Sequence, residues 1–190
     1  MEIIPQLLLG LSLASAAGLR AFLPLLVLAL AAHFHVVHLN GQFGWLQSGT
    51  ALVVLSVAAI AEILSDKIPV VDHALDAVQT LVRPAAGALA MASTQSHFDP
   101  VMAGVLGLIM GAPLAGTLHA AKSGTRLAST ATTAGLANPF LSLAEDATSA
   151  VLSVLAIFAP YLAAFVALLV FYGGWRAWKK IRGLKKVTGG

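Results

Sequence analysis

Cysteine is absent from the chain, which excludes disulfide bonds, thiolate catalysis and cysteine-ligated metals. Charge is also scarce: Asp, Glu, Lys and Arg make up 10% of the residues, whereas soluble domains carry about 25%. Hydrophobic residues reach 58% and the mean hydropathy is +0.89. This balance excludes an ordinary soluble domain and predicts an all-α membrane protein built as one compact bundle.

Lysine and arginine are missing from two links between hydrophobic segments, residues 33–49 and 93–99. Because cytoplasmic loops carry an excess of Lys and Arg, we expect these two links to be external. The N-terminal residues Met1–Pro5 carry no basic side chain, so no cleavable signal peptide is expected. The sequence therefore predicts a multi-pass protein of the inner (plasma) membrane with both termini in the cytoplasm.

Six of the eleven basic residues lie near the C-terminus: Arg176, Lys179, Lys180, Arg182, Lys185 and Lys186. Without them the formal charge is 5 − 8 = −3. The tail therefore favours contact with lipid headgroups, and no nucleic-acid partner is expected.

Six hydrophobic segments follow one another along the chain: residues 3–32, 50–64, 70–92, 100–121, 139–159 and 160–178. They predict about six spans in one transmembrane domain, residues 1–178, followed by a basic cytoplasmic tail, residues 179–190. Helix breaks are expected near Gly18–Pro24, Arg83–Pro84 and Gly111–Gly116. The alternative is five spans, with residues 70–82 lying in the membrane interface.

The two halves of this domain, residues 1–97 and 98–178, share short patterns. Gly10–Leu11 is matched by Gly107–Leu108, and Ala61–Glu62 by Ala144–Glu145. Three spans in each half would run in opposite directions, which is the pattern of a 3+3 inverted repeat. Runs rich in alanine and leucine also produce such matches by chance.

Arg20 is the only charged residue between Glu2 and Glu62. An arginine at the centre of a membrane helix costs about 2.5–3.5 kcal/mol on insertion scales. We therefore expect its side chain to face the protein interior and to pair with a carboxylate. The candidate partners are Glu62, the first choice, Asp66, Glu145 and Asp146.

The other charged side chains form spaced sets on the predicted helices. Residues three, four or seven apart share a helix face, and this spacing recurs in each set. With Arg20, the candidate solute- or ion-binding residues are Glu62, Asp66, Asp72, Asp76, Arg83, His119, Lys122, Arg126, Glu145 and Asp146. The alternative is that these are helix ends at the interface, positive-inside anchors and helix-dipole partners. No catalytic residue and no cofactor is predicted, and a metal site is undetermined because no dense ligand motif is present.

Several of these motifs together resemble a family of small bacterial membrane proteins known only as a domain of unknown function (DUF4126). The motifs are residues 18–24, the stretch from Glu62 to Asp72, Arg83–Pro84, the set His119, Lys122 and Arg126, Asn138–Pro139 and Glu145–Asp146. The resemblance covers nearly the whole chain except the tail. It implies a membrane protein and no particular activity or substrate.

Three functions fit the sequence. The first is a transporter or permease that moves an ion or a small, anionic solute past the buried charges. The second is a membrane scaffold or assembly protein, in which those charges are structural ion pairs and small residues such as Gly104 and Gly107 pack helices or form a homo-oligomer. The third is an enzyme that modifies lipids inside the membrane. The expected partners are membrane lipids and an unidentified small solute or ion.

Overall fold

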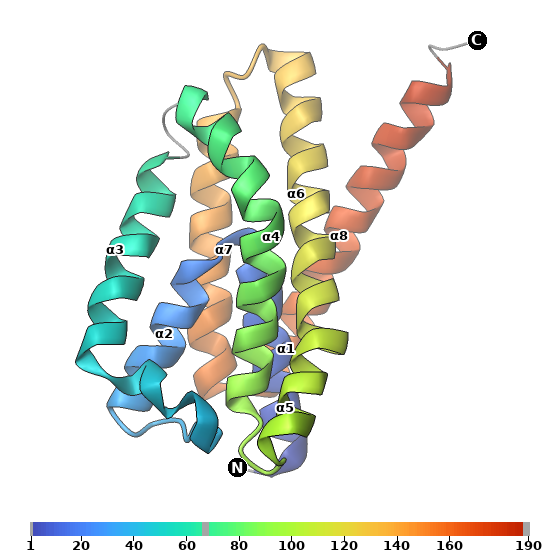
Figure 1. Cartoon of the computed structure of the whole chain (residues 1–190). Coiled ribbons are helices and arrows are strands. Elements are labelled where there is room, and N and C mark those ends of the chain that lie inside the picture. Colours follow the sequence, from blue (N-terminus) through green and yellow to red (C-terminus); the bar gives the residue numbers. More distant parts are fainter. Residues whose placement is uncertain (1, 66–68, 188–190) are drawn as a thin grey trace.

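The computed structural model describes residues 2–65 and 69–187, without the side chains of residues 69–77, 174, 177, 178 and 180–187. Every regular element within these residues is a helix, which confirms the predicted all-α fold (Figure 1). The elements are α1 (Ile3–Leu19), α2 (Phe22–His33), the 3₁₀ helix η1 (Gly41–Gln47), α3 (Gly49–Ser65), α4 (Pro69–Thr94), α5 (Pro100–Leu106), the π-helical turn η2 (Gly107–Gly111), α6 (Ala112–Thr133), α7 (Asn138–Phe158) and α8 (Pro160–Val187).

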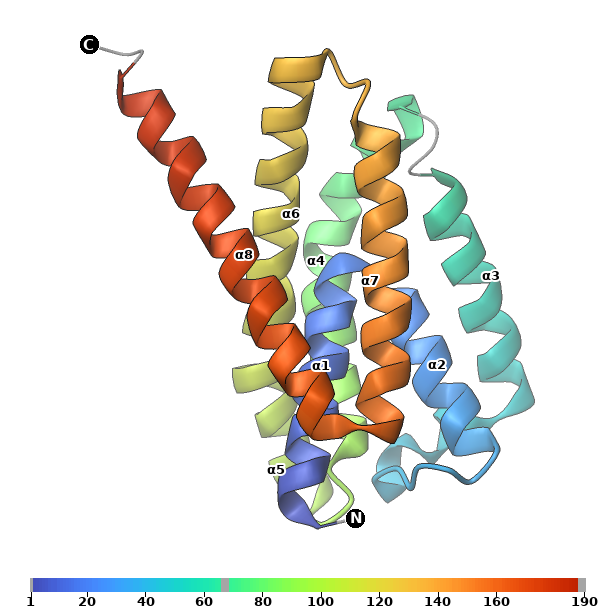
Figure 2. The same cartoon turned by 180° about the vertical axis from the view of Figure 1, so that it is seen from behind.

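The first hydrophobic segment folds back on itself. α1 rises from one end of the bundle to Leu19, and α2 returns from Phe22 to the same end (Figures 1 and 2). The predicted break near Gly18–Pro24 is therefore confirmed, and the two helices on either side of it run in opposite directions; whether residues 3–32 cross the membrane once stays a prediction. We call this pair of helices the hairpin and residues 19–22 its tip.

The remaining long helices run along the bundle in alternating directions. α3 leaves the end where the chain begins, α4 returns to it, α5–η2–α6 leaves it, α7 returns and α8 leaves it (Figures 1 and 2). We call that end the N-terminal end and the opposite one the C-terminal end. α1 begins at the N-terminal end and α8 ends at the C-terminal end (Figures 1 and 2), whereas both termini were predicted on one side; the side of the membrane on which each terminus lies stays a prediction. The predicted antiparallel pair joined at Ala159 is confirmed.

Two predicted helix breaks are absent from the described residues. α4 continues through Arg83 with Pro84 inside it, which also contradicts the alternative of a separate interfacial helix at residues 70–82. Residues Pro100–Thr133 form one continuous helix through Gly111–Gly116. The wider turn of η2 comes just before Pro113, and such a turn accommodates a proline without ending the helix.

The outer surface of the bundle is apolar, whereas charged side chains lie inside it. Large hydrophobic residues on α3, α7 and α8, such as Val53, Phe158 and Leu168, are more than half exposed, whereas Arg20 and Arg83 are fully buried. Helices Pro100–Thr133 and Asn138–Phe158 are each long and apolar enough to cross a membrane, and η1 with α3, bent by 67°, would make a third span. This inverted distribution fits a helical membrane protein; the count of six spans stays a prediction.

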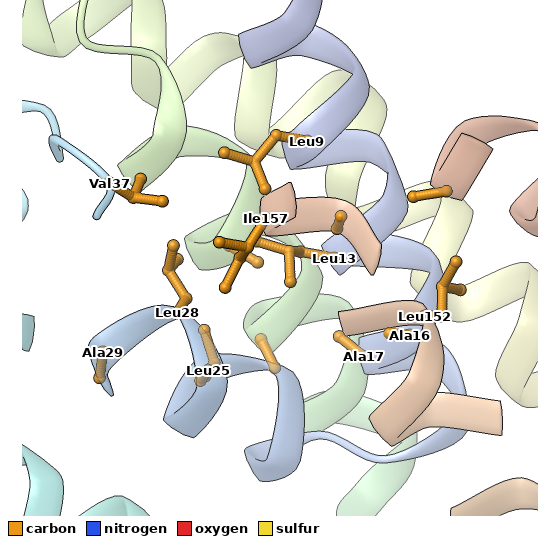
Figure 3. Packing of buried hydrophobic residues seen from close by; sticks show 14 of the residues in the cluster. Leu9, Leu13, Ala16, Ala17, Leu25, Leu28, Ala29, Val37, Leu152 and Ile157 are labelled. Atoms are coloured by element: carbon orange, nitrogen blue, oxygen red, sulfur yellow. The ribbon is translucent and has the colours of Figure 1, made fainter. Parts of the chain in front are cut away.

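α1 is the central helix. All its residues from Ser12 to Leu19 are buried, and it packs against α4, α6, α7 and α8. In Figure 3, Leu13 of α1 and Leu28 of α2 lie close to Ile157 of α7. A helix that is apolar all round belongs in a core, so the hairpin is held from several sides.

Glycines allow α4 and η2 to approach closely where they cross. A Cβ atom at Gly111 would lie 2.4 Å from the carbonyl oxygen of Gly87, and one at Gly87 would lie 2.7 Å from that of Gly111. Small residues at helix contacts are the usual means of close packing in membranes.

We expect Gly111→Ala to destabilise the protein by about 1–3 kcal/mol, because the added methyl group meets the backbone of α4. Gly104→Ala, whose Cβ would meet nothing within 4 Å, is the matched control. Titration of the purified protein from mild detergent into sodium dodecyl sulfate measures both. Equal unfolding midpoints for the two variants would refute close packing at Gly111.

The two halves differ in architecture. The first half opens on the hairpin, and the second opens on a continuous helix of 34 residues. The inverted repeat therefore stays a prediction.

Candidate functional site at the hairpin tip

The carbonyl oxygens at the end of α1 are bound by side chains of three other helices. Ser149 of α7 donates to the Ala16 oxygen at 3.2 Å, Arg83 of α4 donates to that of Gly18 at 3.1 Å, and Lys122 of α6 donates to that of Leu19 at 3.2 Å. The last carbonyls of a helix lack partners within it and carry its negative dipole end. The two cations therefore satisfy both the hydrogen bonds and the charge of the α1 terminus.

The backbone amides at the start of α2 are bound by a carboxylate. Ala21 and Phe22 donate to Glu62 Oε1 and Oε2 at 2.9 and 3.1 Å. Glu62 lies near the end of α3 and is 4% exposed. A carboxylate is favoured here because the first amides of a helix are unpaired and carry its positive dipole end.

Arg20 lies at the tip with its fully buried guanidinium directed at α7. Its Nη2 donates to Ser142 Oγ at 2.9 Å, and its Nε forms an ion pair with Asp146. Nη1 also lies 3.5 Å from the backbone oxygen of Glu62. The side chain thus links the hairpin to α3 and α7.

Arg83 connects α4 to the hairpin and to α6. Its guanidinium donates to Gln79 Oε1 and lies 3.6 Å from Glu62 Oε1. His119 Nδ1 lies 3.1 Å from Arg83 Nη1 and its Nε2 lies 3.3 Å from Thr80 Oγ1. Because a guanidinium only donates, Nδ1 is the acceptor, and the imidazole proton is placed on Nε2, facing Thr80.

Glu145 of α7 binds two cations of α6. Its Oε2 lies 2.9 Å from Lys122 Nζ and 3.1 Å from Arg126 Nη2. Lys122 therefore connects this carboxylate to the carbonyl of Leu19 at the tip.

The tip lies deep within the bundle. Leu19 is sixteen residues from Ile3 along α1, and Arg83 is eleven residues from Thr94 along α4. At 1.5 Å per residue these lengths are about 24 and 17 Å from the N-terminal end. The hydrocarbon core of a bilayer is about 30 Å thick, so the tip falls inside it when the N-terminal end lies at the interface.

Most of the candidate residues predicted from the sequence converge on this tip. The structure brings together Arg20, Glu62, Arg83, His119, Lys122, Arg126, Glu145 and Asp146. Asp66 lies outside the described residues, and Asp72 and Asp76 lie in the part of α4 whose side chains are not described. Among the described carboxylates, Asp146 forms the ion pair with Arg20. Glu62, the first choice, offers Arg20 its backbone oxygen and binds the hairpin amides with its side chain.

Two uncharged side chains of α4 join the site without having been predicted. Gln79 binds Arg83, and Thr80 contacts His119. Gln79 is four residues before Arg83 and three after Asp76, so the spacing of one helix face identifies it. Thr80 carries no comparable signal.

The arrangement combines opposed helix ends with charges of both signs, which suits the binding of a small charged group. Among the described side chains, no group of three His, Asp or Glu residues is placed to hold a metal ion. Acid–base groups are present, among them the contact between His119 Nε2 and Thr80 Oγ1 at 3.3 Å.

Among known protein families, the one described as "Domain of unknown function (DUF4126)" matches residues 7–180. No curated protein and no solved structure matches the chain. The match covers most of the hairpin, α3 to α7 and most of α8.

Proposed function

The chain belongs to the DUF4126 family, and we propose that it is a small membrane transporter whose solute site is the hairpin tip. The observation that carries the proposal is the helix break at Arg20–Ala21, whose backbone groups are bound by buried charged side chains. At membrane depth, irregular backbone is tolerated only inside protein or beside a polar cavity. Transporters place their sites at such interrupted helices.

We place the C-terminal end of the bundle in the cytoplasm. That end carries the basic part of α8, whereas the link of residues 34–48 at the other end has histidine and no Lys or Arg. The positive-inside rule then puts the C-terminus in the cytoplasm and the N-terminus outside. In this arrangement five helical segments cross the membrane and the hairpin enters from outside.

The solute class that suits the tip is a small anion. Arg83, Lys122 and the amides of α2 all favour negative charge, and the Glu62 carboxylate occupies the amides in this structure. An anionic solute would displace the Glu62 carboxylate from these amides as it binds.

Proteoliposomes loaded with the pH indicator pyranine test transport. Gradients of chloride, nitrate, phosphate and acetate are applied in turn, with the membrane potential clamped by valinomycin and potassium. We expect at least one anion to move faster than through protein-free vesicles. Arg20→Gln should slow it about tenfold or more, since it removes a charged hydrogen-bond donor. Thr132→Ala, at the exposed end of α6, is the control and should transport normally.

A scaffold is the second candidate, because the charges of the tip are engaged with one another and with the hairpin backbone. It predicts no flux of any tested anion above that of protein-free vesicles. It also predicts that stability lost when one partner of an ion pair is removed returns when both are replaced.

A further inference from the structure

α8 lies against the bundle over its first half only. Ala163 and Ala167 are buried against their neighbours, whereas Leu168 is 66% exposed. Beyond this point the helix leans away from α6 and α7 towards the C-terminal end (Figures 1 and 2). Such an angle leaves space beside the helix that a lipid molecule is able to fill.

A groove follows this side of α8. Its lower part has a volume of about 260 Å³ and lies between α1, α6 and α8, with Ser15, Leu114 and Ala164 among its walls. Its upper part, of about 70 Å³, lies between α6 and α8 and includes Ala121 and Trp175. Phe171 lines both parts, so the two apolar hollows adjoin along α8 between Ala164 and Trp175. Eleven residues of helix span about 16 Å.

The upper end of the groove is basic. Lys179 Nζ lies 5.6 Å from the ring centroid of Trp175, and Arg176 Cζ lies 5.9 Å from that of Tyr172. Both cations are exposed. Aromatic rings beside Lys and Arg mark the headgroup level of the cytoplasmic leaflet, where basic segments attract anionic lipids.

We propose that this groove is a binding site for an anionic phospholipid. One acyl chain lies along Ala164, Phe171 and Trp175, and the phosphate lies at Arg176 and Lys179. The apolar length and the cationic end match the two parts of such a lipid. This inference does not require that the hairpin tip transports a solute.

Fluorescence quenching by brominated lipids tests the site. The variant Trp45→Phe/Trp178→Phe keeps Trp175 as the only tryptophan and is placed in phosphatidylcholine vesicles. Increasing fractions of dibrominated phosphatidylglycerol or dibrominated phosphatidylcholine are then added. Each basic side chain near an anionic lipid contributes about fivefold in affinity, so phosphatidylglycerol should reach half-quenching at a mole fraction lower by at least about fivefold.

Two further variants locate the lipid. Arg176→Gln/Lys179→Gln should bring the phosphatidylglycerol curve to that of phosphatidylcholine. Ala121→Phe should fill the groove and weaken quenching by both lipids, whereas Val54→Phe on the exposed face of α3 should change neither. Equal quenching by the two lipids would show an unselective lipid annulus and overturn the proposal. Chemical cross-linking tests the remaining alternative. If both lipids quench weakly and the protein gives cross-linked dimers that Ala121→Phe abolishes, a second copy of the chain fills the groove and the proposal is overturned.

Discussion

Arg20→Leu is expected to destabilise the protein by about 3–5 kcal/mol, the usual effect of removing one partner of a buried ion pair. The variant leaves Asp146 without the guanidinium that binds it and Ser142 without its donor. Titration from mild detergent into sodium dodecyl sulfate, followed by circular dichroism, measures the loss. Arg176→Leu, which removes an exposed arginine from α8, is the matched control and should cost less than about 1 kcal/mol.

The double variant Arg20→Leu/Asp146→Leu separates the roles of the pair. Replacing both partners of a buried ion pair by apolar residues is often neutral or stabilising, so the double variant should be more stable than Arg20→Leu. If it is stable and transports no anion, the pair serves the proposed function. If the losses of the two single variants simply add, the two side chains are not coupled and the geometry at the tip is refuted.

Glu62→Gln is expected to loosen the start of α2. The carboxylate accepts hydrogen bonds from both Ala21 and Phe22, whereas an amide places its NH₂ group against one of these donors or against Arg83. Hydrogen bonds to charged groups contribute about 1.5–3 kcal/mol. This corresponds to about 10- to 150-fold faster hydrogen exchange at the two amides.

Hydrogen–deuterium exchange by mass spectrometry, on peptides that cover residues 19–27, measures this change. Glu145→Gln is the matched control, because Glu145 binds Lys122 and Arg126 and does not contact the amides of α2. It should leave the exchange of this peptide within a few fold of wild type. Unchanged exchange in Glu62→Gln would show that the carboxylate does not hold the hairpin.

The residues of the site could be predicted from the sequence better than their pairing. Charge in an apolar chain is costly, so the eight charged and histidine side chains at the tip were identifiable as interior groups. Helical spacing placed His119, Lys122 and Arg126 on one face. Spacing within a helix carries no information about the depth at which two helices meet. It therefore could not show that Asp146, rather than Glu62, forms the ion pair with Arg20.

The return of α2 could not be predicted from the sequence. A run of 30 apolar residues with one break fits a kinked crossing as well as a hairpin, since both leave unpaired backbone groups at the same place. The direction after Arg20 depends on Glu62 of α3 binding the amides of α2, which is a contact between distant parts of the chain. The breaks predicted at Pro84 and Pro113 are absent because neighbouring helices or a wider turn accommodate each proline.

The central claim is that residues 3–33 enter the membrane and leave it on the same side. The chain has no cysteine, so single cysteines at three exposed positions, Ile4, Phe34 and Leu136, test this claim directly with a membrane-impermeant maleimide on intact cells. The structure predicts that Ile4→Cys and Phe34→Cys are both labelled from outside and that Leu136→Cys is labelled only after the cells are opened. Labelling of Phe34→Cys from outside while Ile4→Cys reacts only in opened cells would show that these residues cross the membrane, and would contradict the hairpin.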